Sequence, residues 1–200
     1  MTFVLATNNP GKVEEVQAVF EKSGLSKLIS LADLGLFFEP AETGTTFEEN
    51  AIQKAAETLE FLRKNGHDNM AVLADDSGLC INALNDKPGV DSANFMGRET
   101  PYKIRNAHIL SLLSNEPNRT AYFMCVIACA FPDGKIITTE GVIWGEIAHA
   151  PAGGGGFGYD PIFHISEYGK TSAELSIEEK NKISHRGKAL DLMIRKLSDK

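Results

Sequence analysis

The chain has 200 residues, of which 42% are hydrophobic, and it carries a formal net charge of −7 with a pI near 5.3. A chain of this length can bury one sizeable core, so we predict a single domain that spans residues 1–200. The acidic balance disfavours surfaces that neutralise a nucleic-acid backbone or bind anionic lipid, so we expect neither a nucleic-acid nor a membrane partner.

The sequence gives no sign of export or membrane insertion. MTFVLATNNP lacks a basic region followed by a long apolar stretch, and no segment reaches the roughly 18 apolar residues that span a bilayer. Cys80, Cys125 and Cys129 are odd in number, lack C-x-x-C spacing and lie in apolar runs, which favours buried thiols over a disulfide or a zinc site. We therefore expect a soluble, cytoplasmic protein.

The first predicted elements are a strand and a helix. FVLAT (3–7) is a short apolar run, and Asn9 followed by Pro10 is a good N-cap and first helical residue. Val13, Val16 and Phe20 then form the apolar face of the helix. A second strand is predicted near residues 27–32, followed by the loop DLGLFFEPAETG.

The next predicted helix covers residues 47–64. Thr46 and Glu49 form a T-x-x-E capping box at its start. Its apolar stripe consists of Ile52, Ala55, Ala56, Leu59 and Leu62. The apolar strand MAVLA (70–74) follows and leads into the acidic segment ADDSG, at the carboxyl end of a strand, where open α/β sheets bind ligands.

In the second half the chain changes from helices to a run of strands. A helix begins at Thr100 and Pro101, with its apolar face at Ile104, Ala107, Leu110 and Leu113. Strands are predicted over 120–131, 136–140 and 142–148, with the turn PDG at 132–134. A last helix spans 184–197 with Leu190, Met193, Ile194 and Leu197 on its apolar face. We predict an α/β fold with a mixed central sheet and flanking helices.

Lys12 lies in the first turn of its helix, where the helix dipole disfavours a cation. TNNPGK is not a P-loop, because it has one glycine and a valine after the lysine. Free N–H groups at a helix N-terminus, together with Thr, Asn and Lys side chains, can still bind phosphate. The residues alone leave phosphate binding and a solvated lysine as two open alternatives.

The last helix has the same feature. Ser184 is a natural N-cap, so His185 and Arg186 lie in the first turn, and Lys180 comes just before. A bound anion and a solvated basic cluster both account for these cations.

ADDSG is the strongest acidic feature. Carboxylates can hold a hard divalent cation and one of them can activate a water. Because neighbouring side chains on a strand point in opposite directions, we expect Asp75 or Asp76 to face the site and the other to cap the turn. The alternative is a plain Asp-Ser-Gly turn.

The run GGGGFGYDPIF (153–163) combines four glycines with Phe157 and Tyr159. Consecutive glycines indicate a close approach of the backbone to a ligand or partner. The two aromatic rings are candidates to stack on a base, and the alternative is a flexible turn with two core aromatics. A metal-binding acid, two cationic helix starts and this loop together suit a nucleoside polyphosphate bound through Mg²⁺.

Seven motifs along nearly the whole chain resemble the inosine triphosphate pyrophosphatase family. They are T-x-N-x-x-K (7–12), TFEENAIQKA, LADDSGL, PGVDSANF, RTAYF, GGFGYDPIF and KNKISHRGKAL. The resemblance implies two lobes around a nucleotide cleft, a homodimer, and hydrolysis of dITP, ITP and XTP to the monophosphate and pyrophosphate.

The resemblance also implies roles for the matching residues. Asp76 would be the catalytic acid and a Mg²⁺ ligand, with Glu42 as a further metal ligand and Glu49 as its rival. The implied substrate-binding residues are Thr7, Asn8, Asn9, Pro10, Gly11, Lys12, Ser77, Phe157, Gly158, Tyr159, Asp160, Lys180, His185 and Arg186.

The chain departs from the family pattern at several positions. Asn94 stands where the family often has an arginine after Ser-Ala, and His164, Ser172 and Ile177 replace more usual residues around the pocket rim. These differences concern fine specificity and not the class of reaction. A nucleotide-binding regulatory module that does not cleave its ligand is the alternative function, and a purely structural protein is a more distant one.

Overall fold

The computed structural model describes residues 1–25 and 27–198, which form two compact units. Unit 1 comprises Met1–Asp76, Cys125–Gly141 and His185–Lys200, and unit 2 comprises Ser77–Met124 and Val142–Ser184. The predicted single domain of 1–200 also includes residues 26, 199 and 200, which lie outside the described residues, and it stays a prediction. Within the described residues, no helix is long and apolar enough to cross a membrane.

The strands form a mixed sheet, as predicted. Their bounds are β1 (Thr2–Leu5), β2 (Leu28–Ser30), β3 (Met70–Ile81), β4 (Lys87–Pro88), β5 (Thr120–Ala130), β6 (Ile136–Ile147), β7 (Phe163–Ile165) and β8 (Lys170–Thr171). The hydrogen-bonded order is β2-β1-β3-β5-β6-β7-β8, and β4 pairs with β3. β1 is parallel to β2 and β3, whereas β4 is antiparallel to β3, and β7 is antiparallel to β6 and β8.

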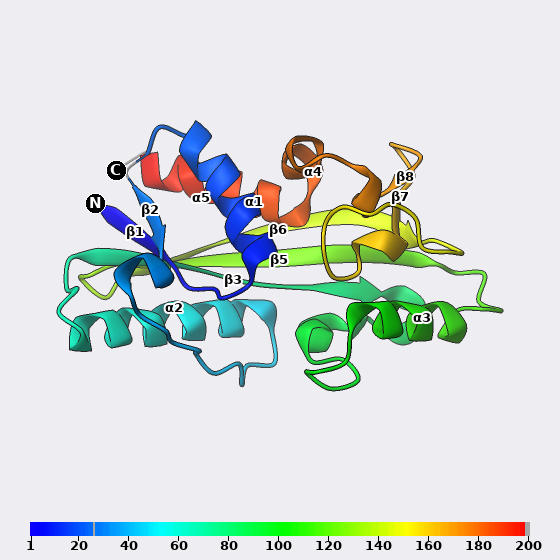
Figure 1. Cartoon of the computed structure of the whole chain (residues 1–200), viewed down its shortest axis with the longest axis horizontal. Helices are drawn as coiled ribbons and strands as arrows, with labels where there is room; N and C mark the ends of the chain where they lie inside the picture. The colour runs from blue at the N-terminus through cyan, green and yellow to red at the C-terminus, as the bar shows by residue number, and fades with distance from the viewer. Residues whose placement is uncertain (26, 199–200) are drawn as a thin grey trace. The chain divides into compact units, whose positions relative to one another are not determined.

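Unit 1 has helices on both faces of its part of the sheet. Figure 1 shows α1 (Pro10–Lys22) and α5 (His185–Ser198) on one face and α2 (Phe47–Lys64) on the other. The predicted apolar faces of α1 and α5 are confirmed, because Val16, Phe20, Leu190 and Met193 are buried in one cluster with Phe3 of β1. One hydrophobic cluster of unit 1 therefore lies between this helix pair and the sheet.

The predicted helix 47–64 is confirmed with both of its bounds. Thr46 Oγ1 accepts from the backbone N–H of Glu49, and Glu49 Oε2 accepts from that of Thr46, which completes the capping box. The predicted stripe is partly wrong, because Ala56 is exposed. The buried face also includes three polar residues, Asn50, Lys54 and Thr58.

Unit 2 contains α3 (Tyr102–Leu112) and α4 (Ile177–Ile183). The predicted apolar face of α3 is wrong at Ile104, which is 52% exposed, and at Ala107, which is also exposed, whereas Arg105 is buried. The two terminal nitrogens of Arg105 donate to four backbone carbonyls of the segment 92–98, so the polar contacts of this guanidinium decide which side of the helix faces inward.

The helix α4 is absent from the sequence-based prediction. Its signal is a second capping box, in which Ser176 Oγ accepts from Glu179 N and Glu179 Oε2 accepts from Ser176 N. Ser184 ends α4 in an extended conformation, with φ −66° and ψ 158°, and α5 then begins at His185. The predicted last helix is therefore correct to within one residue at each end.

The cysteine prediction is confirmed. Cys80, Cys125 and Cys129 are buried and form no disulfide. Burial raises the pKa of the Cys80 thiol to about 11 and that of the Cys125 thiol to about 12, so these groups stay protonated at neutral pH.

Two strands are longer than predicted. β3 does not end at Ala74 but runs through ADDSG to Ile81, and the predicted strands 136–140 and 142–148 are one strand, β6. Gly141 allows β6 to continue, because a Cβ atom there would lie 2.1 Å from the carbonyl oxygen of His185 and 2.6 Å from the backbone nitrogen of Ala189. The glycine marks a close approach of α5 and not a break in the strand.

Substitution of Gly141 by alanine is expected to destabilise the protein by about 3 kcal/mol, because a methyl group would collide with the backbone of α5. Urea unfolding of the variant checks this. Gly154→Ala is the matched control, since a Cβ atom at Gly154 meets no atom within 4 Å and its free energy of unfolding should stay within about 0.5 kcal/mol of the wild type. Equal stability of the two variants would contradict the explanation.

Candidate functional site

The parallel pairing of β1 and β3 brings two of the predicted site segments together in unit 1. Leu5 is opposite Leu73, and the N–H of Ala6 donates to the carbonyl of Leu73 at 2.7 Å. Two residues further along each chain segment come Thr7 and Asp75. The segment 7–12 and the acidic pair therefore lie at the same edge, the carboxyl end of β1, where open α/β sheets bind their ligands.

Lys12 is bound to a carboxylate of the chain itself. Asn9 caps α1, because its Oδ1 accepts from the backbone N–H groups of Gly11 and Lys12 at 3.0 and 3.3 Å. Lys12 Nζ lies 3.0 Å from Asp75 Oδ2, and its side chain is 16% exposed. The solvated alternative is therefore wrong, and only a small part of the Lys12 side chain reaches the surface.

The other polar side chains of the segment 7–12 also have partners within the chain. Thr7 Oγ1 accepts from the backbone N–H of Asn9 at 3.2 Å, and Asn8 Nδ2 donates to the carbonyl of Phe38 at 3.2 Å. These contacts fix the turn between β1 and α1. They hold the first turn of α1 in one conformation, which is the preorganisation that an anion site needs.

Asp75 and Arg186 form the buried centre of a charge network in unit 1. Arg186 Nε and Nη2 donate to Asp75 Oδ2 at 3.2 and 3.1 Å, and Arg186 Nη1 donates to Glu15 Oε2. Burial alone would raise the pKa of Asp75, but the charges of Lys12 and Arg186 outweigh it and hold that pKa well below its usual range. The solvated alternative for the basic residues at the start of α5 is therefore wrong for Arg186.

Asp76 points to the other face of β3, towards α2. Asp76 Oδ1 accepts from Lys54 Nζ at 2.7 Å, and Asp76 Oδ2 accepts from Asn50 Nδ2 at 3.2 Å. Burial raises the pKa of Asp76, and the charge of Lys54 offsets only part of this effect. The predicted opposite directions of the two aspartates are confirmed, whereas the predicted capping of a turn by one of them is wrong, because both lie inside β3.

Glu42 and Asp76 meet at one cation. Lys54 Nζ donates to Glu42 Oε1 at 2.9 Å and to Asp76 Oδ1 at 2.7 Å. Burial of Lys54 disfavours its charged form and by itself would lower its pKa. The negative charges of Asp76, Asp75 and Glu42 outweigh this effect, so the pKa of Lys54 is raised. The rival residue Glu49 uses its carboxylate in the capping box and accepts from Thr45 and Thr46.

This pair of carboxylates fits a hard divalent cation. Both groups offer oxygen, and their oxygens already surround a positive charge, the ammonium of Lys54. In the described part of the chain, no group of three or more His, Cys, Asp or Glu side chains could hold a metal by itself. Two carboxylates that are completed by substrate phosphates are a common arrangement for Mg²⁺.

In unit 2, Asp160 joins Lys180 to Phe157. Asp160 Oδ2 accepts from Lys180 Nζ at 2.6 Å and from the backbone N–H of Phe157 at 2.8 Å. The ammonium lies 4.9 Å from the centre of the Phe157 ring, a cation–π contact. Gly156, with φ +66°, makes this possible, because a Cβ atom there would lie 2.3 Å from Asp160 Oδ2.

The two aromatic residues of this loop have different environments. Tyr159 is a core residue with 3% exposure, and its hydroxyl donates to the carbonyl of Ser92 at 2.8 Å. Phe157 is half-buried. The glycine run lies close to the backbone at Ala173 in the same unit, since a Cβ atom at Gly153 would lie 2.5 Å from the carbonyl group of Ala173. Of the two rings, Phe157 is the better candidate for stacking on a ligand.

The remaining predicted residues divide between the two units. His185 is buried at the start of α5 in unit 1, and the half-buried Ser77 follows Asp76 on β3 in unit 2. The carbonyl of Gly158 accepts from Asn106 Nδ2 at 3.1 Å in unit 2.

Sequence reasoning missed Asn50, Lys54 and Glu15. Asn50 and Lys54 are spaced i, i+4 on α2 beside the buried Ala51 and Ala55, so a polar pair inside an apolar face was the available signal. Glu15 is the third residue after Lys12 on α1, and its burial depends on Arg186, which is 171 residues away in the sequence. No local pattern identifies that partner.

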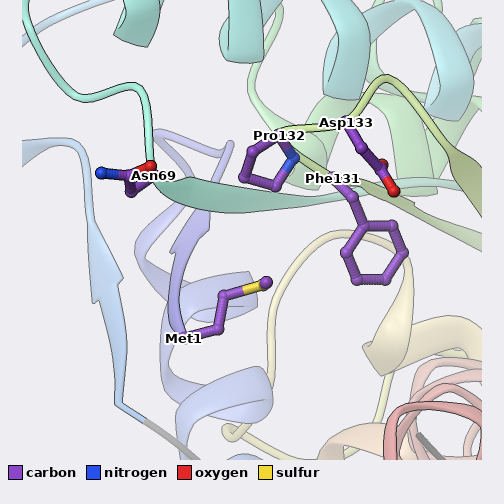
Figure 2. A pocket seen from close by; sticks show the side chains of 5 residues that line it. All are labelled: Met1, Asn69, Phe131, Pro132 and Asp133. Atoms are coloured by element: carbon purple, nitrogen blue, oxygen red, sulfur yellow. The ribbon is translucent and has the colours of Figure 1, made fainter.

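A separate hollow of about 460 Å³ lies elsewhere in unit 1. Figure 2 shows Met1, Asn69, Phe131, Pro132 and Asp133 around it. Its lining has one carboxylate and no lysine, arginine or histidine side chain, and it includes none of the predicted site residues. This hollow is therefore a poor candidate for binding a polyphosphate.

Comparison with known proteins shows the family. The model of the Ham1 family matches residues 3–196. The chain belongs to the Ham1 family. Similar members include proteins named dITP/XTP pyrophosphatase from Desulforamulus reducens, which is 48% identical and covers 95% of this chain and 92% of its own length, and from Exiguobacterium sp., which is 47% identical with coverage of 95% and 93%.

Solved structures of Ham1 proteins are similar in fold to this chain. The Staphylococcus aureus Ham1 protein is 39% identical with a TM-score of 0.85 and covers 100% of this chain and 99% of its own. A HAM1 protein from Coxiella burnetii is 38% identical with a TM-score of 0.86 and covers 100% of both chains. The resemblance in the motifs is thus confirmed, and the mixed α/β fold is the fold of this family.

We expect Asp75→Asn to destabilise the protein by about 3 kcal/mol or more, because the charges of Lys12 and Arg186 would lose a buried partner. The folded-state pKa of Asp75 is lowered, so its contribution is present above the ordinary carboxyl pKa of about 3.9 and is lost as pH falls below it. Urea unfolding from pH 7 to pH 2.5 should show a weaker acid dependence in the variant.

The control for this prediction is Asp191→Asn on α5, which removes an exposed i, i+4 pair with Arg195. Its effect should stay below about 0.5 kcal/mol. An Asp75→Asn variant as stable as this control would contradict the role of Asp75 in the buried network.

Proposed function

We propose that the protein hydrolyses noncanonical purine nucleoside triphosphates, namely dITP, ITP and XTP or dXTP, to the monophosphate and pyrophosphate. The proposed biological role is the removal of these nucleotides before their incorporation into DNA or RNA. The observation that carries the proposal is the meeting of Glu42 and Asp76 at one cation, the ammonium of Lys54. The names of similar Ham1 family members support it.

The residues of unit 1 suit the phosphate chemistry. Thr7, Asn8, Asn9, Pro10, Gly11 and Lys12 form the capped start of α1 and are proposed to bind the triphosphate. Asp76 and Glu42 are proposed to hold Mg²⁺. Ser77, the next residue on β3 and the first of unit 2, is proposed to contact the substrate. When bound, Mg²⁺ supplies positive charge against the phosphate oxygens.

Asp76 is the proposed general base. Water gives its proton to Asp76 as its oxygen attacks the α-phosphorus, and the bond from that phosphorus to the bridging oxygen breaks to release pyrophosphate. The raised pKa of Asp76 favours this role, because it makes the carboxylate a better proton acceptor. Lys12 offers positive charge to the leaving group, and Asp75, with its lowered pKa, keeps the cations nearby in place.

Residues of unit 2 suit the base. Phe157, Gly158, Tyr159, Asp160 and Lys180 are the proposed residues here. For His185 and Arg186, which belong to unit 1, a role at the base is implied by the family resemblance alone. A donor to the 6-oxygen of hypoxanthine or xanthine rejects adenine, whose amino group would leave that donor unpaired. Lys180 is such a donor. Arg186 already donates to Glu15 and Asp75, so its contact with the base stays a prediction.

We also propose a homodimer in the cytoplasm. The homodimer rests on the family resemblance, and the size of the protein in solution tests it. The cytoplasmic location rests on the three buried free thiols, which suit a reducing compartment. No contact in the described residues favours the regulatory module over the enzyme. The buried base Asp76 favours the enzyme, since a sensor has no need of one.

A panel of nucleotides with Mg²⁺ tests the proposed function directly. Pyrophosphate release from ITP, dITP and XTP should exceed that from ATP and GTP by at least about tenfold. Binding of ITP without pyrophosphate release would favour the regulatory module.

Asp76→Asn should lower turnover by at least about 100-fold, because the amide cannot accept the proton. Asp68→Asn, in an exposed loop, is the control and should keep wild-type turnover.

Lys12→Ala should raise the KM for ITP and lower kcat, because the ammonium is proposed to contact the triphosphate in both the ground state and the transition state. The exposed Lys22→Ala in the last turn of α1 is the control. An unchanged KM and kcat in a folded Lys12→Ala variant would contradict the proposed contact with the triphosphate and leave Lys12 only its pairing with Asp75.

A further inference from the structure

Lys54 is a buried cation at the place where the proposed metal ligands meet. It is 5% exposed, and its Nζ lies 2.9 Å from Glu42 Oε1 and 2.7 Å from Asp76 Oδ1. The long side chain starts on α2, one helical turn after Asn50, which binds the other oxygen of Asp76. The ammonium is therefore held between the two carboxylates from a rigid element.

The charges at this point set the affinity for an added cation. Glu42 and Asp76 carry two negative charges, and Lys54 leaves one of them in excess. Divalent-cation affinity rises with the number of charged oxygen ligands and falls when a positive charge is a few ångströms away. Screening by water is weak between Lys54 and Asp76, which are both buried, and stronger at Glu42, whose side chain is 33% exposed.

We propose that Lys54 competes with the metal and keeps the nucleotide-free protein from binding divalent cations tightly. The inference rests on the proposed function, because it concerns the same two carboxylates. A triphosphate adds its own negative charge, which restores the attraction for Mg²⁺ that Lys54 reduces. The metal and the nucleotide then bind together, and a metal ion without nucleotide is held weakly.

The test is the binding of Mn²⁺ alone to the nucleotide-free protein, measured from the electron paramagnetic resonance signal of free Mn²⁺. Lys54→Met should lower the Kd for Mn²⁺ by at least about tenfold relative to the wild type. The control is Lys64→Met on the same helix, where the side chain is 69% exposed and lies 3.4 Å from Glu60. This control should leave the Kd unchanged.

A double variant decides whether the gain arises at the proposed ligands. Adding Glu42→Gln to Lys54→Met restores the net charge of the wild-type cluster, so the Kd for Mn²⁺ should return towards the wild-type value. Lys54→Gln keeps a polar side chain beside Asp76 and provides the same test if Lys54→Met does not fold. Unchanged or weaker Mn²⁺ binding in the folded Lys54 variants would overturn the proposal.

This experiment is independent of turnover. One outcome is tighter Mn²⁺ binding by Lys54→Met together with no pyrophosphate release from any nucleotide by the wild type. It would refute the proposed enzymatic function and support the competition between Lys54 and a divalent cation. Pyrophosphate release by the wild type, together with unchanged Mn²⁺ binding in the folded variant, would keep the enzyme and refute the role of Lys54.

Discussion

Two adjacent buried carboxylates, Asp75 and Asp76, are the constraint on which unit 1 depends. A buried carboxylate without a partner costs several kcal/mol, and here two follow each other on β3. Neighbouring side chains of a strand point to opposite faces, so the two carboxylates are paired with cations on different faces of the sheet. Lys12 and Arg186 reach Asp75 from α1 and α5, and Lys54 reaches Asp76 from α2.

This arrangement changes the meaning of the cations at the helix starts. Lys12 and Arg186 each lie in the first turn of a helix, where the dipole disfavours them by about 0.3–1 kcal/mol. Their shared partner Asp75 accounts for both positions, because the pairing of a buried charge outweighs that cost. The misplaced cations are thus explained by an anion inside the protein, so their positions do not by themselves indicate a bound phosphate.

The sequence allowed prediction of features that depend on neighbouring residues. The bounds of α2 followed from Thr46 and Glu49, and the start of α1 followed from Asn9 and Pro10, because capping acts over a few residues. The mixed sheet followed from the order of apolar segments.

Features that depend on distant segments were missed or misjudged. Gly141 looked like the end of a strand because the reason for the glycine, the backbone of α5 with which a Cβ atom would collide, lies more than 40 residues away in the sequence. Likewise, nothing near Lys54 shows that Glu42 and Asp76 meet at its ammonium. The motifs located the candidate site, but the partners inside it depend on tertiary packing.

The surroundings of the two aspartates separate their chemistry. Asp75 is fixed as an anion by two cations, and its lowered pKa makes it a poor proton acceptor. Asp76 shares a single ammonium with Glu42 and has a raised pKa, so it can take up a proton at a smaller energetic cost. Neighbouring groups whose pKa values are pushed in opposite directions divide structural and acid–base roles between them. The charge network thus assigns the structural role to Asp75 and leaves Asp76 as the group suited to accept a proton from water.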